Sequence, residues 1–428
     1  MKTYLFLFLL FLSWGVCAQT DTLLQAHELR ARGGLPNFFR KLSLAKPVTI
    51  AYLGGSITNA GNGYREQSVA WLQKQYPAST ITHINAGIGG TGTELANFRL
   101  KEQVLRGEPD LVFVEFAVND QGTKAETIHS NMEGIVRNIW RHNPHTDICF
   151  VYTMTGEMAP VLNKGELPAG ARAMEDIADY YQVPSIDMGL QIVALSSKGE
   201  LVYKGKPEAF PGKMVFSGDN VHPYPETGHH LYTEAIARSF MLMAGHAGKF
   251  KHPLIKPYTE DIWVNADMIP ADKLQTSRSW KPVVPGKDAI SKMTPVPFPS
   301  IIMADSAGAS IRVVFKGTMI GLYDLVGPGS GQYDVIIDGK PFKNYIRFDK
   351  YALTWRPQYF VVSGLSNEKH TVEFKIAEAH FDKKEILKEK AAGFDEHPEK
   401  YKNYACFAAY LLLNGKLVKS KMNYSNNQ

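Results

Sequence analysis

Apolar runs of strand length alternate with stretches of helical pattern in the first half of the chain, from Pro47 to Asp187. Strands that are apolar along their whole length are typical of a parallel sheet with helices on both faces, so the alternation predicts a three-layer α/β domain. The strand-like runs are Val48–Leu53, Thr80–Asn85, Leu111–Phe116, Ile148–Thr153 and Ser185–Asp187. The helical stretches are Gln67–Gln75, Glu94–Arg106, Ala125–Arg141, Arg172–Tyr181 and, as the closing helix, Pro225–Ala244.

A serine and an Asp–His pair supply the residue types of a hydrolytic triad. Ser56 lies in Gly-Gly-Ser-Ile-Thr at 54–58, directly after the first apolar run. Asp219 precedes His222 by three residues, in the loop before the closing helix. Serine is a weak nucleophile at neutral pH and needs a base to take its proton and a third group to orient that base. We therefore expect Ser56 as the nucleophile, His222 as the base and Asp219 as the orienting group.

Two further segments end strands that we expect to neighbour the strand before Ser56. Gly90 closes the segment after the second run, and Asn119 follows the third. Ligands collect at the carboxyl ends of strands in open α/β sheets. An oxyanion hole needs donors aimed at one point, and the Ser56 N–H, the Gly90 N–H and the Asn119 amide suit that task. Gly89 is an alternative to Gly90 as the glycine donor.

These segments, in this order, resemble the blocks of the SGNH/GDSL hydrolase superfamily. The likeness covers about half the chain, from Pro47 to Ala244, and each block alone is a weak signal. It implies a flavodoxin-like sheet, ester hydrolysis and the site residues named above. The matching segments are Gly-Gly-Ser-Ile-Thr at 54–58, Gly-Ile-Gly-Gly at 87–90, Val-Asn-Asp at 118–120 and Asp-Asn-Val-His at 219–222.

The chain departs from the family pattern at two positions. Gly55 stands where the family's GDSL motif has Asp, and Ala117 stands where the third block usually has Gly. The first departure removes a structural carboxylate and leaves the triad residues in place. Many sugar-directed members of the family resemble the Gly-Gly-Ser form.

The amino terminus has the features of a secretory signal peptide. Met1-Lys2-Thr3 precedes an apolar run that ends near Leu12, and small residues lead up to Gln19. The run is too short to span a bilayer. The residues before Cys17 form a poor lipobox, which favours cleavage after Ala18. We expect residues 1–18 to be a signal peptide and the protein to be secreted or periplasmic.

The composition changes after the α/β domain, which we expect at 19–250. Residues 251–299 are rich in Pro, Lys and Asp and are predicted to be a linker with an irregular entry. Residues 300–428 carry β-rich runs, and Asp338-Gly339 and Asn414-Gly415 have the residues of hairpin turns. The pattern predicts an antiparallel, jelly-roll-like β-sandwich. Tyr351, Trp355, Arg356 and Tyr359 on its loops could stack on sugars, although such rings more often fill a core.

Composition excludes several other classes of function. Lys and Arg number 47 against 42 Asp and Glu, too small and dispersed an excess to indicate nucleic acid. After the signal peptide only Cys149 and Cys406 remain, both in apolar strand-like runs, and we expect two separate buried thiols. No dinucleotide or Walker motif is present, and the histidine pairs at 142/145 and 229/230 lack partners at ligand spacing. We expect no cofactor, no metal, no nucleic acid and no transmembrane segment.

The residues and the resemblance together favour a secreted esterase that removes O-acetyl groups from a polysaccharide or oligosaccharide. The expected partner is therefore an acetylated glycan substrate. Two alternatives remain: a lipase or arylesterase for longer acyl esters, and a non-catalytic glycan-binding protein. The intact Ser56, Asn119, Asp219 and His222 oppose the second alternative.

Overall fold

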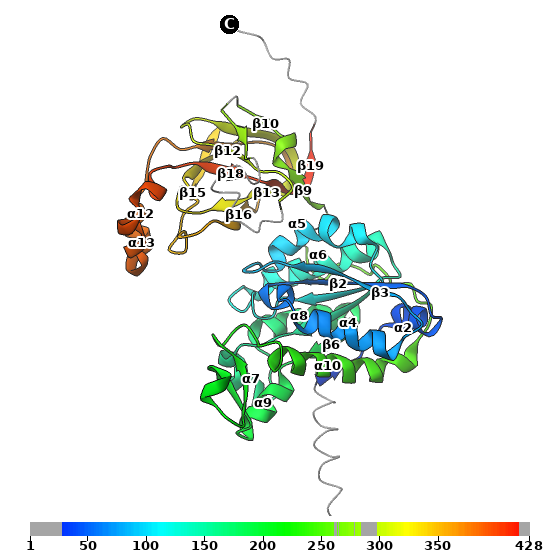
Figure 1. Cartoon of the computed structure of the whole chain (residues 1–428). Helices are drawn as coiled ribbons and strands as arrows, with labels where there is room; N and C mark the ends of the chain where they lie inside the picture. Colours follow the sequence, from blue (N-terminus) through cyan, green and yellow to red (C-terminus); the bar gives the residue numbers. More distant parts are fainter. Residues whose placement is uncertain (1–27, 261–262, 264, 278, 284–297, 419–428) are drawn as a thin grey trace, which may run out of the picture. The chain divides into compact units, whose positions relative to one another are not determined.

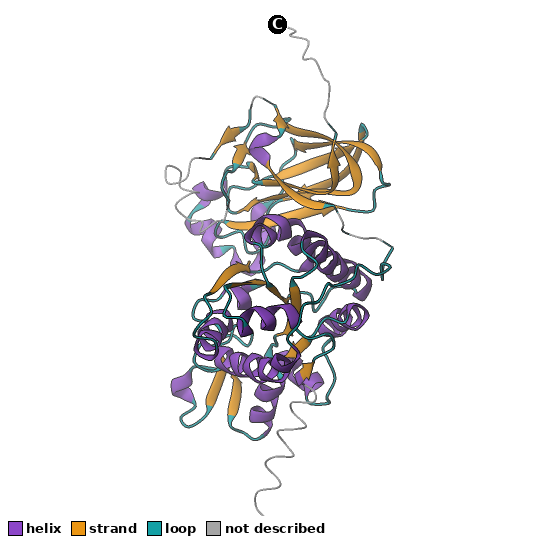
Figure 2. Ribbon diagram, turned by 90° about the vertical axis from the view of Figure 1, so that its right-hand side faces the viewer, coloured by secondary structure: helices purple, strands orange, loops and turns teal. Residues whose placement is uncertain are grey.

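The computed structural model describes residues 28–260, 263, 265–277, 279–283 and 298–418. The chain divides into two compact units between Val264 and Asn265. The first unit is a sheet between layers of helices, and the second consists mainly of strands (Figures 1 and 2). The predicted signal peptide lies outside the described residues, so secretion stays a prediction.

The first unit is built on a six-stranded sheet with the order β1-β6-β5-β4-β2-β3. All neighbours are parallel except β1, which pairs antiparallel with β6. Strands β4 and β5 are buried along their whole length, as expected for strands covered on both faces. The strands are β1 (Leu29–Arg30), β2 (Val48–Gly54), β3 (Ile81–Gly87), β4 (Leu111–Glu115), β5 (Asp147–Tyr152) and β6 (Ser185–Asp187).

Two hydrophobic cores, one on each face of this sheet, hold the helices. The first core packs against α2 (Pro36–Ser43), α4 (Tyr64–Gln75), α9 (Leu190–Ser197) and α10 (Gly228–Met243). The second packs against α5 (Thr93–Gln103), α6 (Ala125–His142) and α8 (Ala169–Tyr181). Short helices α3 (Ser56–Asn59) and α7 (Ala159–Leu162) and a parallel pair, β7 (Leu201–Lys204) with β8 (Met214–Ser217), complete the unit.

The prediction of a three-layer parallel α/β domain is confirmed. Each of the five expected strands and five expected helices is present, with ends shifted by a few residues. Elements β1, α2, α9 and the β7–β8 pair were not predicted. These elements are short, and two to eight residues hold too few repeats of a pattern to separate them from loops.

The second unit contains two antiparallel sheets, which confirms the predicted separate β domain. The larger sheet has eight strands and branches at the long strand β13 (Ser310–Val326), which pairs with β10, β16, β17 and β19. Its other strands are β9 (Ala266–Pro270), β10 (Gln275–Thr276), β14 (Gln332–Ile337), β15 (Lys340–Ile346), β16 (Arg356–Val362), β17 (Glu368–Ile376) and β19 (Tyr410–Leu417). The smaller sheet holds β11 (Lys281–Pro282), β12 (Ile302–Ala304) and β18 (Cys406–Ala408); two short helices, α12 (Lys383–Leu387) and α13 (Ala392–Glu396), also belong to this unit.

Part of the predicted linker, 251–299, is regular structure. Strands β9, β10 and β11 fall within it and pair with strands of the second unit. The prediction of an irregular segment is wrong for these strands. They are two to five residues long, and two of them end at a proline, Pro270 and Pro282. Short runs that contain proline are typical of loops, so the sequence did not indicate strands here.

The two predicted hairpin turns have different outcomes. Asp338 and Gly339 connect β14 to β15 and both have positive φ, of 51° and 78°, as such a turn requires. Asn414-Gly415 is not a turn, because it lies inside β19 and pairs with β13 beside an irregularity in register at Gly317. A Cβ on Gly415 would lie 2.3 Å from the Lys316 carbonyl oxygen, so this glycine permits a close approach of two backbones.

Cys149 and Cys406 are free and buried, as predicted. Among the described residues, no helix combines the length and the apolar character that crossing a bilayer requires.

The segment after α10 packs onto α6 and α5 within the first unit. The backbone N–H groups of Tyr258 and Thr259 donate to the Glu133 carboxylate at 2.6 and 2.7 Å. The Trp263 ring is 3% exposed and meets the Phe98 ring edge to face at 5.0 Å. The first unit therefore extends beyond residue 250, where the sequence analysis ended it.

We predict that Trp263→Ala lowers the free energy of unfolding by about 3–5 kcal/mol, because it empties a buried aromatic site. Chemical denaturation of the full chain measures this value. Leu254→Ala is the control, since this side chain is 43% exposed and should change stability by less than about 0.5 kcal/mol. Equal stability of the two variants would contradict the packing described here.

Candidate active site

Three neighbouring strands of the first unit end at one edge of its sheet. In the parallel register, Gly54 of β2 lies opposite Gly87 of β3 and Glu115 of β4. Parallel strands carry their carboxyl ends to the same edge, so the segments that follow them begin side by side. This edge carries Ser56, the glycine segment 87–90 and Asn119.

Ser56 is the first residue of the single-turn helix α3. The turn is closed by the Asn59 N–H, which donates to the Gly55 carbonyl at 3.1 Å, and by the Ala60 N–H, which donates to the Ser56 carbonyl at 3.0 Å. The Ser56 Oγ lies 2.9 Å from Nε2 of His222. The structure thus brings together two residues separated by 166 positions in the chain.

Asp219 holds the other side of the His222 ring. Its Oδ2 lies 2.6 Å from Nδ1 of His222, and its Oδ1 accepts from the backbone N–H groups of Val221 and His222 and from the Ser217 hydroxyl. Burial alone would raise the pKa of Asp219, but the hydrogen bonds from His222, Val221 and Ser217 outweigh it and hold the pKa well below its usual range. The ionised carboxylate fixes the imidazole with Nδ1 as a donor and Nε2 facing Ser56.

The loop that carries Asp219 and His222 is fixed at Asn220. This residue has a φ of +80°, in the left-handed region, which Asn tolerates better than most residues. Its carbonyl accepts a hydrogen bond from the Gly156 N–H at 3.1 Å. A Cβ on Gly156 would lie 2.0 Å from the Asn220 Oδ1, so a side chain at 156 would displace the loop.

Asn119 packs directly against the turn that carries Ser56. A Cβ on Gly55 would lie 2.0 Å from the Asn119 Oδ1 and 3.1 Å from its Nδ2. The absence of a side chain at position 55 therefore makes room for the Asn119 amide. The next residue, Asp120, is buried and accepts from the backbone N–H and the hydroxyl of Thr93, which anchors this segment to α5.

The two glycines considered as oxyanion donors differ in geometry. Gly90 has a φ of +70°, in the left-handed region, and turns the chain between β3 and α5. A Cβ on Gly89 would lie 3.6 Å from the Ser56 Cβ, whereas a Cβ on Gly90 would have no atom within 4 Å. The assignment of Gly90 as the donor stays a prediction.

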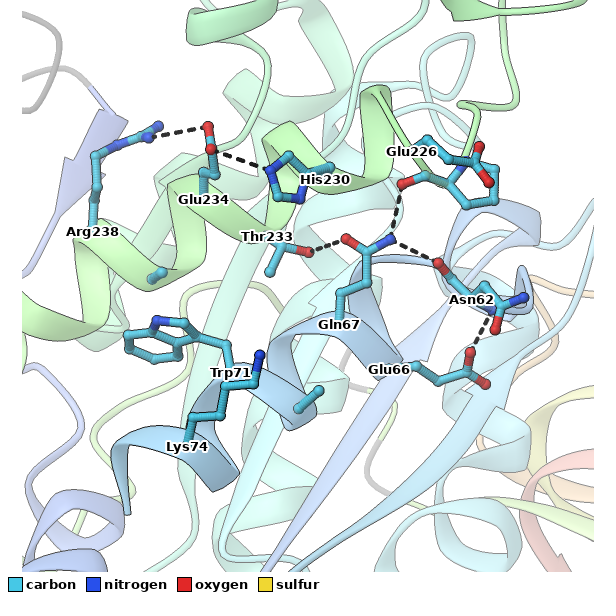
Figure 3. Close-up of a pocket in the computed structure, with 13 residues that line it drawn as sticks. Asn62, Glu66, Gln67, Trp71, Lys74, Glu226, His230, Thr233, Glu234 and Arg238 are labelled. Carbon is cyan, nitrogen blue, oxygen red and sulfur yellow. Dashed lines mark hydrogen bonds and ion pairs between the residues drawn. The ribbon is translucent and has the colours of Figure 1, made fainter. Parts of the chain in front are cut away.

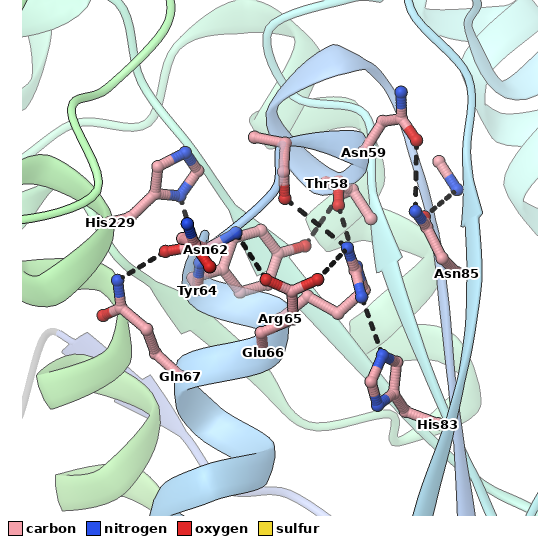
Figure 4. Close-up of polar contacts among 12 residues, drawn as sticks. Thr58, Asn59, Asn62, Tyr64, Arg65, Glu66, Gln67, His83, Asn85 and His229 are labelled. Atoms are coloured by element: carbon pink, nitrogen blue, oxygen red, sulfur yellow. Dashed lines mark hydrogen bonds and ion pairs between the residues drawn. The ribbon is translucent and has the colours of Figure 1, made fainter. Parts of the chain in front are cut away.

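A buried arginine supports the far end of the same turn (Figure 4). Arg65 is 4% exposed and donates to the carbonyls of Thr58 at 3.3 Å and Ala60 at 3.5 Å. Its guanidinium also lies 2.7 Å from Nε2 of His83. Because arginine can only donate, this nitrogen is the acceptor of a neutral imidazole. Burial, and after it the Arg65 charge, lower the pKa of His83.

His229 lies beneath the first turn of α4 and is 1% exposed. Its Nδ1 accepts the Tyr64 backbone N–H at 3.1 Å, and the two rings stack (Figure 4). Burial, and after it the charge of His222, lower the pKa of His229 to about 4. This imidazole is therefore neutral at physiological pH.

A groove of about 910 Å³ lies between α4 and α10 (Figure 3). Its polar groups bond one another: the Gln67 amide donates to the Asn62 and Pro225 carbonyls, and the Thr233 hydroxyl donates to the Gln67 oxygen. Arg238 and Glu234 form an ion pair farther along. The lining residues are Asn62, Glu66, Gln67, Ala70, Trp71, Lys74, Pro225, Glu226, His230, Thr233, Glu234, Ala237 and Arg238.

The aromatic residues considered for sugar binding in the second unit occupy different surroundings. Trp355 meets the Phe407 ring edge to face at 4.9 Å, so it belongs to the packing of the unit. Arg356 and Tyr359 lie in β16 and not on a loop as predicted, and Arg356 forms an ion pair with Asp349. Tyr351 is 53% exposed, and the Lys390 ammonium lies 3.9 Å from its ring centroid.

Within the described residues, no group of three or more His, Cys, Asp or Glu side chains is placed to hold a metal ion.

Three buried residues that support the site, Glu115, Arg65 and His229, were not predicted from the sequence. Glu115 is fully buried at the end of β4, and Thr58 and Thr153 donate to its carboxylate. Arg65 and His229 also lie beneath the site. A signal for Glu115 was present, because a charged residue that interrupts the apolar run of a doubly covered strand needs buried partners.

Comparison with known proteins gives a family and a fold. Residues 52–227 match the model of the GDSL-like lipase/acylhydrolase family. Two crystal structures of a two-domain esterase active on acetylated mannans, one co-crystallized with mannopentaose, are each 20% identical to the chain. They cover 93% and 92% of this chain and 99% of their own, with TM-scores of 0.70 and 0.68, and therefore share its fold.

An acetylxylan esterase from Geobacillus stearothermophilus is also 20% identical, over 45% of this chain and 93% of its own, with a TM-score of 0.37. A search of curated proteins found no match.

We predict that the burial of His229 makes the protein less stable in acid. Its pKa is about 4 when folded and near 6.5 when unfolded, so the unfolded state binds the proton more readily between these values. The free energy of unfolding should therefore fall as pH drops from 6.5 to 4, by on the order of 2–3 kcal/mol. Denaturation curves across this range measure the slope.

His229→Asn is the matched variant, because its side-chain oxygen can still accept the Tyr64 N–H but does not titrate. Its stability should depend less steeply on pH than that of the wild type. Parallel pH profiles for the two proteins would contradict a buried neutral His229.

Proposed function

Because the chain belongs to the GDSL-like lipase/acylhydrolase family, we propose that it is a serine esterase that removes O-acetyl groups from a polysaccharide or oligosaccharide. The observation that carries the proposal is the line of contacts from Ser56 through His222 to Asp219, with distances of 2.9 and 2.6 Å. A hydroxyl, an imidazole and a carboxylate in this order constitute an activated nucleophile.

The proposed reaction begins with attack of the Ser56 Oγ on the acetyl carbonyl carbon. Nε2 of His222 takes the hydroxyl proton as the C–O bond forms. Asp219 keeps Nδ1 of His222 protonated and stabilises the imidazolium that results. The Ser56 N–H, the Gly90 N–H and the Asn119 amide donate to the oxyanion of the tetrahedral intermediate.

The second half of the reaction releases both products. His222 gives its proton to the sugar oxygen as the C–O bond to the acyl group breaks, which leaves an acetyl ester on Ser56. A water molecule then gives a proton to His222 and attacks this ester. Acetate leaves, and the proton returns from His222 to Ser56.

Two observations support an acetyl ester of a sugar as the substrate. The segment that follows Ser56 exposes two polar residues, Asn59 and Asn62, and the Asn59 oxygen accepts from the Asn85 amide, so these positions offer a long acyl chain no apolar surface. Long chains gain affinity by burying methylene groups, at about 0.8 kcal/mol each. The two-domain protein that shares this fold is an esterase active on acetylated mannans.

We predict that Ser56→Ala lowers kcat for an aryl acetate and for acetylated glycans by about 10³-fold or more, as expected for loss of a triad nucleophile. Acetate release across a panel of acetylated polysaccharides measures the effect and also identifies the polymer. Ser197→Ala, at an exposed serine of the same unit, is the control and should behave as the wild type. Near-normal turnover by a folded Ser56→Ala protein would reject Ser56 as the nucleophile.

We also predict that acetyl esters are cleaved faster than butyryl and octanoyl esters of the same leaving group. The reason is that the exposed Asn59 and Asn62, which follow Ser56, are polar and give added methylene groups no apolar surface to bury. Initial rates with the three esters test this order. A rate that rises with chain length would favour a lipase or arylesterase, and glycan binding without turnover of any ester would favour a non-catalytic binding protein.

A further inference from the structure

The buried carboxylate of Glu115 accepts hydrogen bonds from both ends of the turn that carries Ser56. Glu115 and Thr58 are each fully buried, and the Thr58 hydroxyl donates to Oε2 of Glu115 at 2.9 Å. The Gly55 backbone N–H also donates to this carboxylate. Gly55 immediately precedes Ser56, and Thr58 follows it by two residues. Glu115 therefore accepts hydrogen bonds from two residues that flank Ser56 in the sequence.

The directions of these hydrogen bonds follow from the chemistry of the groups. Thr58 gives its one hydroxyl proton to Oε2 of Glu115. The Tyr64 hydroxyl, 2.7 Å from the Thr58 oxygen, must then donate to Thr58. On its other side, Oε1 of Glu115 accepts from the Thr153 hydroxyl at 2.6 Å. Three donors on one carboxylate oppose the effect of burial, which raises the pKa of Glu115.

Packing around Thr58 leaves little room for another arrangement. A Cβ on Gly54 would lie 2.2 Å from the Thr58 oxygen and 2.7 Å from its Cβ. Thr58 thus rests on the α-carbon of Gly54, at the end of the strand that leads to Ser56. The contacts of Thr58 with Gly54, Tyr64 and Glu115 therefore hold the backbone of the turn that carries Ser56.

We propose that Glu115, acting through Thr58, is a positioning residue that sets the orientation of Ser56 toward His222. This proposal rests on the proposed role of Ser56 as the nucleophile, and it deepens that role. Glu115 hydrogen-bonds to Thr58 and Thr153 and does not touch the reacting atoms. It acts by holding the turn, and a displacement of about 1 Å in such a position can lower a rate by as much as 10²-fold.

The test compares two substitutions that remove the same kind of hydrogen bond from Glu115. Thr58→Val and Thr153→Val each replace a buried hydroxyl by a methyl group of similar shape. Only Thr58 lies on the nucleophile turn. The full-length variants are compared by kcat and KM for an aryl acetate, by the rate of covalent labelling of Ser56 with a fluorophosphonate, and by melting temperature.

We expect Thr58→Val to lower kcat and the labelling rate by about 10–100-fold with little change in KM. Thr153→Val should lower melting temperature to a similar extent but reduce kcat and labelling much less. Thr58→Ser keeps the hydroxyl and should restore most of both rates. Equal losses of kcat and labelling in the two valine variants would show a merely structural carboxylate and overturn the proposal.

A second variant keeps the test decisive if Thr58→Val does not fold. Glu115→Gln preserves the volume and one acceptor, and it should also slow Ser56 labelling more than Thr153→Val does. Labelling at the wild-type rate in Glu115→Gln would overturn the proposal. The labelling rate does not depend on the physiological substrate, so absence of acetate release from every glycan by the wild type would reject the proposed substrate alone.

Discussion

The register of three parallel strands is the constraint on which the site depends. Gly54, Gly87 and Glu115 lie opposite one another in β2, β3 and β4, so the loops that follow begin at one edge. A slip of one residue in this pairing would turn the side chains of a strand to the opposite face of the sheet. The buried strands and the helices packed on both faces fix the register, and the register places Ser56 beside Asn119.

The absence of side chains at positions 54 and 55 has a clear physical cause. The Thr58 side chain occupies the space above Gly54, and the Asn119 amide occupies the space above Gly55. The family's usual Asp at position 55 would need Asn119 to move. The departure from the GDSL motif is therefore part of how this site is packed.

The sequence predicted the parallel sheet because apolar runs and helical patterns alternate over long stretches, where periodicity is most informative. It also predicted that Ser56, Asp219 and His222 lie together in one site. Ser56 follows a strand, Asp219 and His222 precede the closing helix, and their motifs occur in the order of the family's blocks. The contacts of Glu115 could not be predicted in this way. Its partners Thr58 and Thr153 lie 57 and 38 residues away, and no local pattern connects them.

Tertiary packing overrides the local turn preference at one predicted hairpin. Asn414-Gly415 has the composition of a hairpin turn, yet it continues β19 because Gly415 allows the backbone of β13 to approach closely. Strand β15, by contrast, follows the predicted turn at Asp338-Gly339, although nearly all of its residues are exposed.

If Ser56 is the nucleophile, it carries the acyl group during turnover. Rapid acid quenching of the enzyme during hydrolysis of an aryl acetate, followed by peptide mass spectrometry, detects this intermediate. We expect one added acetyl group on the peptide that contains Ser56, and no such adduct in Ser56→Ala. Turnover with no acetylated Ser56, or with the acetyl group on another residue, would rule out Ser56 as the nucleophile.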